Sequence, residues 1–398
     1  MRIGMLTDVY KPHVSGITNY ISLNKRAFED AGHEVFIFTF GDLDYPDDET
    51  NVIRSPGLPL VDTGYYLNFR YNRKAKAQLL TMDLVHVQHP FLSGRLALRY
   101  CRPLHIPIVF TNHTRYDLYA QAYMPLLPEE ISGSLLQSYM PPFCAAVDLV
   151  ISPSAGMGDV MRKLGVTSPI EVVPNGVDLD RYRQTCEDCR GEYGFTAEDV
   201  LLVYSGRLGP EKNVDFLLRA FAGVAEALEH VHLIIIGDGP EEETLKKLAD
   251  QSGVNQRVIF LGMVPYDQMP RLLAMGDIFV TASVTEVHPL SVIEAMASGL
   301  PVVGIHSVGV GDTVEDGITG FLASQNQAAF AAKLTRLCLD VTLRHKMGRA
   351  ARKSSETYSI ERTSRILLSH YERLIYDALP RRRSFSSRLR GMVEKLRS

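Results

Sequence analysis

The sequence has no long apolar run and no strong excess of one charge. Its longest apolar runs, such as VHLIIIG at 231–237, have the length of a strand and fall well short of the ~20 residues that span a bilayer. The net charge of −4 argues against a general nucleic-acid binder. The first residues, MRIGMLTDVY, lack a basic stretch followed by a long apolar one, so no signal peptide is expected.

Cysteine is also scarce, and several common site motifs are absent. The five cysteines mostly stand singly in apolar surroundings, which fits a reducing cytoplasm. Cys186 and Cys189 have metal-like spacing, but no second pair accompanies them, so a chance surface pair is the favoured interpretation and no metal site is expected. There is no P-loop motif, and Gly-Asp-Gly-Pro at 237–240 falls short of the dinucleotide fingerprint. A P-loop NTPase and a nicotinamide enzyme are therefore not supported.

Short apolar strands alternate with helical segments in two successive series. Because such runs are typical of buried parallel strands covered on both faces, the class is α/β, with two doubly wound Rossmann-like domains facing across a cleft. We predict an N-terminal domain over 1–175, a C-terminal domain over 176–360, a helix over 361–380 that packs back on the N-terminal domain, and a basic amphipathic tail over 381–398. The predicted strands lie within 2–8, 33–40, 83–88, 106–113 and 148–154, and then within 200–206, 231–237, 257–262, 278–283 and 300–304.

Cationic side chains follow the first strand of the second series. The run SGRLGPEKN places Arg207 and Lys212 in a loop after Gly206. A guanidinium fork and an ammonium at a strand end are suited to hold a diphosphate, although an exposed basic loop is the alternative. Asp238 and Gly239 follow the next strand, and the glycines there permit close backbone approach.

The stretch TEVHPLSVIEAMASGLPVVG carries two acids eight positions apart, around a helix start. Pro289 suits the first turn of a helix because its missing N–H would be unpaired there, and Gly299 gives the matching stop. Glu286 then lies in the loop before the helix, and Glu294 lies inside it, where it can accept hydrogen bonds from a ribose diol. Backbone N–H groups over 288–291 are available to an anion. The alternative is a solvated Glu286 and a Glu294 paired with a neighbouring cation.

Taken with SGRLGPEKN, PNGVD, GDGP and EAMASGLPVV, this E-x7-E element resembles the retaining glycosyltransferases of family 4, which have the GT-B fold. The resemblance covers about residues 1–375. It implies a nucleotide-sugar donor, most often UDP-linked, with no cofactor and no essential metal. The donor-binding residues it implies are Ser15, Gly16, Gly206, Arg207, Lys212, Asp238, Gly239, Val264, Glu286, His288, Pro289, Leu290 and Glu294.

The resemblance also assigns roles. Arg207 and Lys212 would neutralise the leaving diphosphate, Glu294 would hold the ribose and Glu286 would contact the donor sugar. His113, at the end of a predicted strand, takes the place of the family's active-site histidine and could orient a hydroxyl or handle a proton. These residues other than Glu294 form the expected catalytic set. Two departures are the His-Pro pair at 288–289, where Phe-Gly is commoner, and Ser15 in place of the first glycine of a Gly-Gly loop.

Two basic segments bear on the acceptor. YYLNFRYNRKAKAQLL at 65–80 interleaves cations with aromatic residues, and the tail PRRRSFSSRLRGMVEKLRS has an apolar face if it is a helix. Such segments can lie on an anionic membrane, although the tail could instead be disordered or docked on its own protein. Residues 112–119 also resemble the His-Thr-x-x-Tyr pattern of diacylglycerol glucosyltransferases. The expected acceptor and membrane residues are Tyr65, Tyr66, Phe69, Arg70, Arg73, Lys74, Tyr116, Arg388 and Arg390.

The resulting hypothesis is a retaining hexosyltransferase that moves a hexose, glucose first, from a UDP-sugar to a membrane lipid such as diacylglycerol. Its expected partners are a nucleotide sugar, a lipid acceptor and an anionic membrane surface, with no nucleic acid. The expected location is cytoplasmic, peripheral on the inner face of the cell membrane. The alternatives are a phosphatidylinositol, polyprenyl-linked or soluble acceptor, an isomerase resembling the UDP-N-acetylglucosamine 2-epimerases, and a non-catalytic protein that binds a nucleotide sugar on the same scaffold. The sequence leaves the oligomeric state open.

Overall fold

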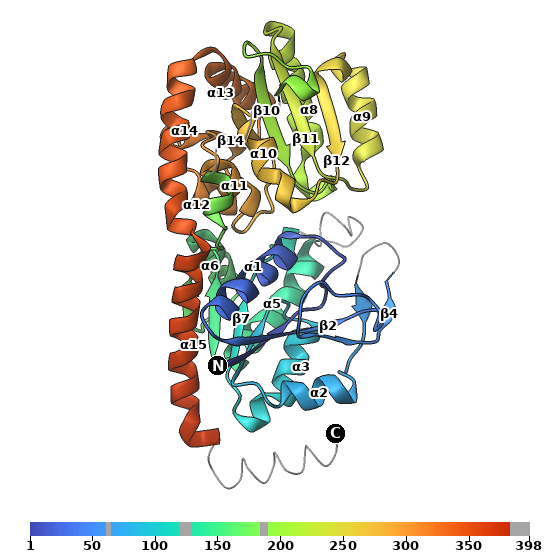
Figure 1. Cartoon of the computed structure of the whole chain (residues 1–398), viewed down its shortest axis with the longest axis vertical. Helices are drawn as coiled ribbons and strands as arrows, with labels where there is room; N and C mark the ends of the chain where they lie inside the picture. The colour runs from blue at the N-terminus through green and yellow to red at the C-terminus, as the bar shows by residue number, and fades with distance from the viewer. Residues whose placement is uncertain (61–64, 119–128, 184–189, 383–398) are drawn as a thin grey trace. The chain divides into compact units, whose positions relative to one another are not determined.

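The computed structural model describes residues 1–60, 65–118, 129–183 and 190–382 (Figure 1). The chain divides into two compact units. The first unit comprises 1–113, 130–176 and 360–398, and the second comprises 114–129 and 177–359. The predicted basic tail at 381–398 lies, apart from its first two residues, outside the described part of the chain.

The first unit is built on a parallel sheet of seven strands in the order β3-β2-β1-β6-β7-β8-β9. The strands are β1 (Arg2–Leu6), β2 (Glu34–Phe40), β3 (Val52–Ser55), β6 (Leu84–Val87), β7 (Ile108–Thr111), β8 (Leu149–Ser152) and β9 (Ile170–Val172), and a small hairpin pairs β4 (Leu58–Pro59) with β5 (Tyr66–Leu67). The helices are α1 (Gly16–Asp30), α2 (Arg73–Leu79), α3 (Leu92–Tyr100), α5 (Glu129–Ala146), α6 (Ala155–Lys163) and α15 (Ile360–Arg382).

Helix α15 is part of this unit although it follows the second unit in the sequence. Its residues Leu367 and Tyr371 are buried in the same core as Ile3 and Ile37 of the sheet, and α15 packs against α1 (Figure 1). At its end, Arg382 donates hydrogen bonds to the carbonyls at 82 and 83, at 3.1 and 2.9 Å. The first unit is therefore closed by the last described helix of the chain.

The second unit has a parallel sheet of six strands in the order β12-β11-β10-β13-β14-β15. The strands are β10 (Val200–Ser205), β11 (Val231–Ile236), β12 (Val258–Gly262), β13 (Ile278–Thr281), β14 (Val302–Ile305) and β15 (Gly320–Ala323). The helices are α7 (Leu179–Arg183), α8 (Val214–Ala227), α9 (Glu242–Gln251), α10 (Met269–Ala274), α11 (Leu290–Ala297), α12 (Val308–Thr313), α13 (Gln327–Leu339) and α14 (Val341–Ser355).

Both faces of this second sheet are covered. Phe221 of α8 and Phe330 of α13 belong to the core on one face, and Ile293 and Met296 of α11 belong to the core on the other. This arrangement explains the near-continuous apolar strands, because a parallel sheet buried on both faces has no solvent-exposed side. The predicted pair of doubly wound sheets is confirmed. In the described part of the chain, no helix is both long and apolar enough to cross a bilayer.

Each sheet reverses its strand order once, between β1 and β6 in the first unit and between β10 and β13 in the second. In open sheets of this type, ligands bind beyond the carboxyl ends of the strands at such a switch point. The loops that leave β1, β6, β10 and β13 are therefore where each unit presents a candidate site.

Candidate functional site

In the second unit, Lys212 and Glu286 meet at the switch point. Lys212 comes from the loop after β10 and Glu286 from the loop after β13, and Lys212 Nζ lies 2.5 Å from Glu286 Oε1. Their side chains are 19% and 22% exposed. Burial alone would lower the pKa of Lys212, but the Glu286 carboxylate outweighs it and the pKa is raised, so the lysine remains charged. A fixed positive charge thus stands at the strand ends.

The loop that carries Arg207 is held to the next loop by main-chain hydrogen bonds. The N–H of Leu208 donates to the Asp238 carbonyl at 2.7 Å, and Arg207 itself is exposed. A Cβ on Gly237 would lie 2.1 Å from the Gly206 oxygen, and one on Gly239 would lie 2.4 Å from the Leu208 oxygen. Both glycines also have positive φ, at 129° and 157°. The glycines of GDGP therefore allow the two loops to approach each other, as predicted for close backbone contact.

The start of α11 brings the His-Pro pair next to the sheet. Pro289 is the residue that caps α11 rather than part of its first turn, with an extended ψ of 115°, and Leu290 begins the helix. The His288 side chain is buried edge-on against Tyr358, with ring centroids 4.9 Å apart, and burial lowers its pKa to about 3. His288 therefore presents its main chain, not its ring, at the helix start.

Glu294 lies deeper on α11 and is 5% exposed. Its Oε1 accepts a hydrogen bond from the Tyr266 hydroxyl at 2.9 Å. Burial raises the pKa of the Glu294 carboxyl, against the opposing effects of Tyr266 and Tyr182. Val264, two residues before Tyr266, is partly buried against the same core. The structure thus gives the predicted ribose acid a tyrosine as its hydrogen-bond partner.

In the first unit, His113 follows β7 and is bonded to Gln88, which follows β6. Gln88 Nε2 donates to the His86 carbonyl at 3.3 Å, so Gln88 Oε1 accepts from His113 Nε2, at 2.7 Å. This bond leaves the lone pair of His113 on Nδ1. Burial, helped by His86 and His89, holds the pKa of His113 well below its usual range. A neutral imidazole of this tautomer can accept a hydrogen bond from a hydroxyl.

The predicted Ser15-Gly16 loop forms the start of α1. The Ser15 hydroxyl accepts from the Thr18 N–H at 3.3 Å, and the Ser15 N–H donates to the Thr18 hydroxyl at 2.7 Å. This reciprocal capping box uses the Ser15 amide within the chain. Of the Ser15-Gly16 pair, only Gly16, the first residue of α1, therefore has a backbone N–H that the helix start can offer to an anion.

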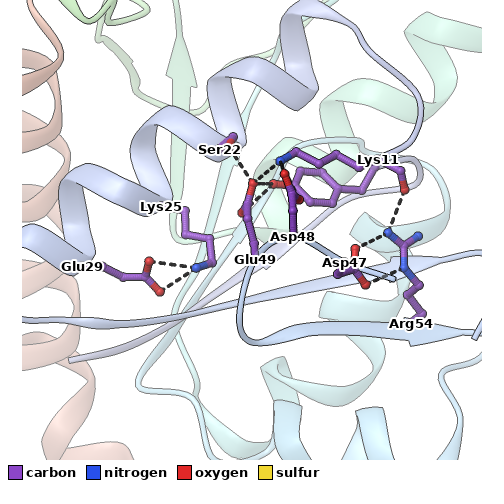
Figure 2. A network of polar contacts seen from close by, with 9 residues as sticks. Lys11, Ser22, Lys25, Glu29, Asp47, Asp48, Glu49 and Arg54 are labelled. Atoms are coloured by element: carbon purple, nitrogen blue, oxygen red, sulfur yellow. Dashed lines mark hydrogen bonds and ion pairs between the residues drawn. The ribbon is translucent and has the colours of Figure 1, made fainter. Parts of the chain in front are cut away.

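A polar network fixes the loop before α1 (Figure 2). Lys11 Nζ lies 2.6 Å from Glu49 Oε1 and 3.0 Å from Asp48 Oδ1. Arg54 donates to the Lys11 carbonyl at 2.7 Å and pairs with Asp47 at 2.6 Å. Both the side chain and the main chain of Lys11 are held, so residues 47–54 set the position of the loop that leads to the Ser15 cap.

The remaining predicted residues are spread over several elements. Tyr65 and Tyr66, at the hairpin strand β5, are partly buried, whereas Phe69 is 66% exposed and Arg70, Arg73 and Lys74 are exposed around the start of α2. Tyr116 is partly buried in a segment assigned to the second unit. Arg388, Arg390, Cys186 and Cys189 lie outside the described residues. Among the described residues, no group of three or more His, Cys, Asp or Glu side chains could hold a metal ion.

Sequence reasoning did not single out Gln88 or Tyr266. Gln88 follows the last residue of β6, and Tyr266 lies four residues after the end of β12. A polar side chain at the carboxyl end of a predicted parallel strand is the signal that could have indicated them. Their partners, His113 and Glu294, lie 25 and 28 positions away in the sequence and could not have been assigned from spacing.

Comparison with known proteins gives two family matches and several relatives. Residues 14–181 match the family described as Glycosyltransferase Family 4, and residues 187–354 match Glycosyl transferases group 1. The chain is 31% identical over 333 residues to an alpha-monoglucosyldiacylglycerol synthase of Streptococcus pneumoniae. This alignment covers 81% of this chain and 75% of that protein. It is 35% identical over 319 residues to a D-inositol 3-phosphate glycosyltransferase of Mycobacterium bovis, over 76% of this chain and 64% of that protein.

Among solved structures, a sucrose-phosphate synthase of Thermosynechococcus elongatus superposes with a TM-score of 0.78. The match covers 94% of this chain and 99% of that structure, at 19% sequence identity. At this identity the likeness concerns the fold. It extends over nearly the whole chain and therefore includes both sheets.

Proposed function

The chain belongs to the glycosyltransferases of group 1 and family 4 and has their GT-B fold, and from this premise we propose that it transfers glucose from UDP-glucose to diacylglycerol with retention, forming an α-glucoside. The observation that carries the proposal is the Lys212–Glu286 pair, a fixed cation beside a carboxylate at the switch point of the second sheet. Such a pair suits a diphosphate joined to a sugar, because it offers one partner to the phosphates and one to the sugar hydroxyls.

In the proposed reaction, the bond between the anomeric carbon and the phosphate oxygen breaks, and the acceptor hydroxyl oxygen bonds to that carbon on the same face. The leaving phosphate oxygen takes the proton of the acceptor hydroxyl. Lys212 and Arg207 stabilise the charge that develops on the diphosphate. Glu286 contacts the sugar, Glu294 holds the ribose, and His113 accepts a hydrogen bond from a sugar hydroxyl through Nδ1. These two cations do the work that a metal ion does in other transferases, so no cofactor is part of the proposal.

The lipid acceptor is supported by the similarity to a protein described as an alpha-monoglucosyldiacylglycerol synthase. A soluble acceptor is the second candidate, and the 35% identity to a D-inositol 3-phosphate glycosyltransferase favours it. A phosphatidylinositol or polyprenyl-linked lipid is the alternative within the lipid class.

The proposal predicts that radiolabel from UDP-glucose passes into the organic phase when the full chain is incubated with vesicles that contain diacylglycerol. Parallel reactions with D-inositol 3-phosphate, and with GDP-linked sugars as donors, test the alternatives in one series. A water-soluble product would contradict the lipid acceptor and support the second candidate. A free epimerised sugar made without any acceptor would contradict glycosyl transfer itself.

Membrane contact, on the inner face of the cell membrane, is proposed for the basic segment at the start of α2. Arg70, Arg73 and Lys74 are exposed beside Phe69. Each cation near an anionic surface contributes about 1 kcal/mol, so the triple variant R70A/R73A/K74A should bind phosphatidylglycerol vesicles about 100-fold more weakly. Vesicle flotation at increasing salt measures this loss.

A matched control removes the same number of exposed cations from the second unit, in the variant R219A/K247A/R349A. This control should float like the wild type. A third variant, shortened to end at residue 382, measures how much the basic tail contributes to vesicle binding. If the α2 variant floats normally and the shortened chain does not, membrane contact is made by the tail and the role of the α2 segment is wrong.

A further inference from the structure

The donor acid Glu294 is placed where a carboxylate is costly. It is 5% exposed, and burial raises the pKa of its carboxyl. A buried carboxyl without donors tends to take up a proton and then becomes a poorer acceptor for hydroxyl groups. If Glu294 holds the ribose, other residues must keep it charged and oriented.

Tyr266 supplies the hydrogen bond that Glu294 needs. Its hydroxyl donates to Glu294 Oε1 at 2.9 Å. Burial and the nearby carboxylate raise the pKa of Tyr266, so the phenol keeps its proton and remains a donor. A hydrogen bond to an ionised acceptor is roughly twice as strong as a neutral one. The bond fixes Oε1 of the carboxylate, and Tyr182 is a second tyrosine that favours the ionised form of the same carboxyl.

The Tyr266 ring is itself held by the segment that follows the PNGVD motif. The Arg181 guanidinium lies 5.2 Å from the centroid of the Tyr266 ring, within the range of a cation–π contact. Arg181 also pairs with Asp178, at 3.8 Å. Asp178 is the last residue of PNGVD, so this motif is connected through two contacts to the tyrosine that bonds Glu294.

We propose that Tyr266 is a positioning residue for the donor ribose, which acts through Glu294 and is oriented by Arg181. The proposal rests on the proposed role of Glu294 in the reaction above. It gives the PNGVD segment a part in nucleotide recognition, since Asp178 pairs with Arg181 and Arg181 contacts the tyrosine ring. All four residues belong to the second unit.

The test compares two nucleotides that differ only in the ribose hydroxyls. Calorimetry measures the Kd of UDP and of 2′,3′-dideoxy-UDP for the wild type and for Tyr266→Phe. The variant should bind UDP about 10-fold more weakly, as for loss of one hydrogen bond to a charged group, and should bind the dideoxy nucleotide within about twofold of the wild type. In turnover, KM for the nucleotide sugar should rise while kcat changes little, because the lost contact is present in both ground and transition states.

Tyr139→Phe is the matched control, because this partly buried tyrosine donates to a main-chain carbonyl, that of Pro90, at 2.7 Å in the first unit. It should leave the Kd of UDP unchanged. Arg181→Met should also weaken the binding of UDP but not that of the dideoxy nucleotide, and the effect should be smaller than that of Tyr266→Phe. Equal losses for both nucleotides, or tighter UDP binding by Tyr266→Phe, would overturn the positioning role. A wild type that does not bind UDP at all would instead overturn the proposed donor, so the two failures are distinct.

Discussion

Replacing Lys212 with alanine is expected to lower kcat about 100- to 1000-fold, the loss that follows removal of one preorganised group that stabilises developing charge. Lys212 is a largely buried cation at the switch point of the second sheet, and Glu286 holds its ammonium at 2.5 Å. In the proposed reaction, negative charge grows on the diphosphate as the glycosidic bond breaks. An alanine leaves that charge without its partner and also leaves Glu286 unpaired in a half-buried site. Single-turnover kinetics with radiolabelled donor measures the effect on the chemical step.

Lys246→Ala provides the control for Lys212→Ala. Lys246 also pairs with a carboxylate, that of Glu242 at 2.7 Å, on helix α9 of the same unit. Its loss should leave kcat unchanged. Lys212→Arg keeps the charge and should retain more activity than alanine. If Lys212→Ala is folded, as judged by its melting temperature, and turns over within tenfold of the wild type, Lys212 does not carry the leaving-group charge.

The sequence predicted most strands of the two large sheets because each of these strands lies in a nearly continuous apolar run. All ten predicted strands are present. The strands β3, β9 and β15 were not predicted. Strand length does not explain this, because five of the predicted strands also have four residues. Instead, β3 and β9 each contain a charged residue and β15 begins with a glycine, so none of the three is a purely apolar run. All three lie at the outer edges of the two large sheets. Edge strands are partnered on one side only and need not be uniformly apolar.

The candidate site, too, could be predicted from the sequence only in part. Lys212 and Glu286 were proposed from separate motifs, and the structure brings them together across 74 positions. The Tyr266–Glu294 and Gln88–His113 bonds could not be predicted from the sequence, because each joins two residues that lie 25 or more positions apart and on different elements. Motifs indicate which residue types reach the ligand edge of a sheet, whereas strand order decides which of them meet. That order was not predictable from strand lengths alone.

The proposed site also includes a buried histidine that makes the second unit sensitive to acid. Burial lowers the pKa of His288 to about 3, against about 6.5 in the unfolded chain. Above pH 6.5, His288 is neutral in both the folded and the unfolded chain and does not change the free energy of unfolding. As the pH falls from 6.5 towards 3, the unfolded chain takes up a proton that the folded chain cannot, so stability decreases, by about 2 kcal/mol at pH 5.

The variant His288→Phe isolates this contribution. Phenylalanine can keep the packing against Tyr358, and it has no proton to take up, so the free energy of unfolding should fall about 2 kcal/mol less between pH 7 and pH 5 than in the wild type. Urea unfolding at the two pH values measures this difference. His345→Phe replaces an exposed histidine in the same unit, and its free energy of unfolding should fall between pH 7 and pH 5 as much as that of the wild type. The raised pKa of Glu294 acts in the opposite direction as the pH falls, and the comparison of variants cancels it, since Glu294 is unchanged in all three chains. An equal pH dependence in His288→Phe and the wild type would show that His288 is protonated in the folded protein, and its ring would then have to lie outside the core.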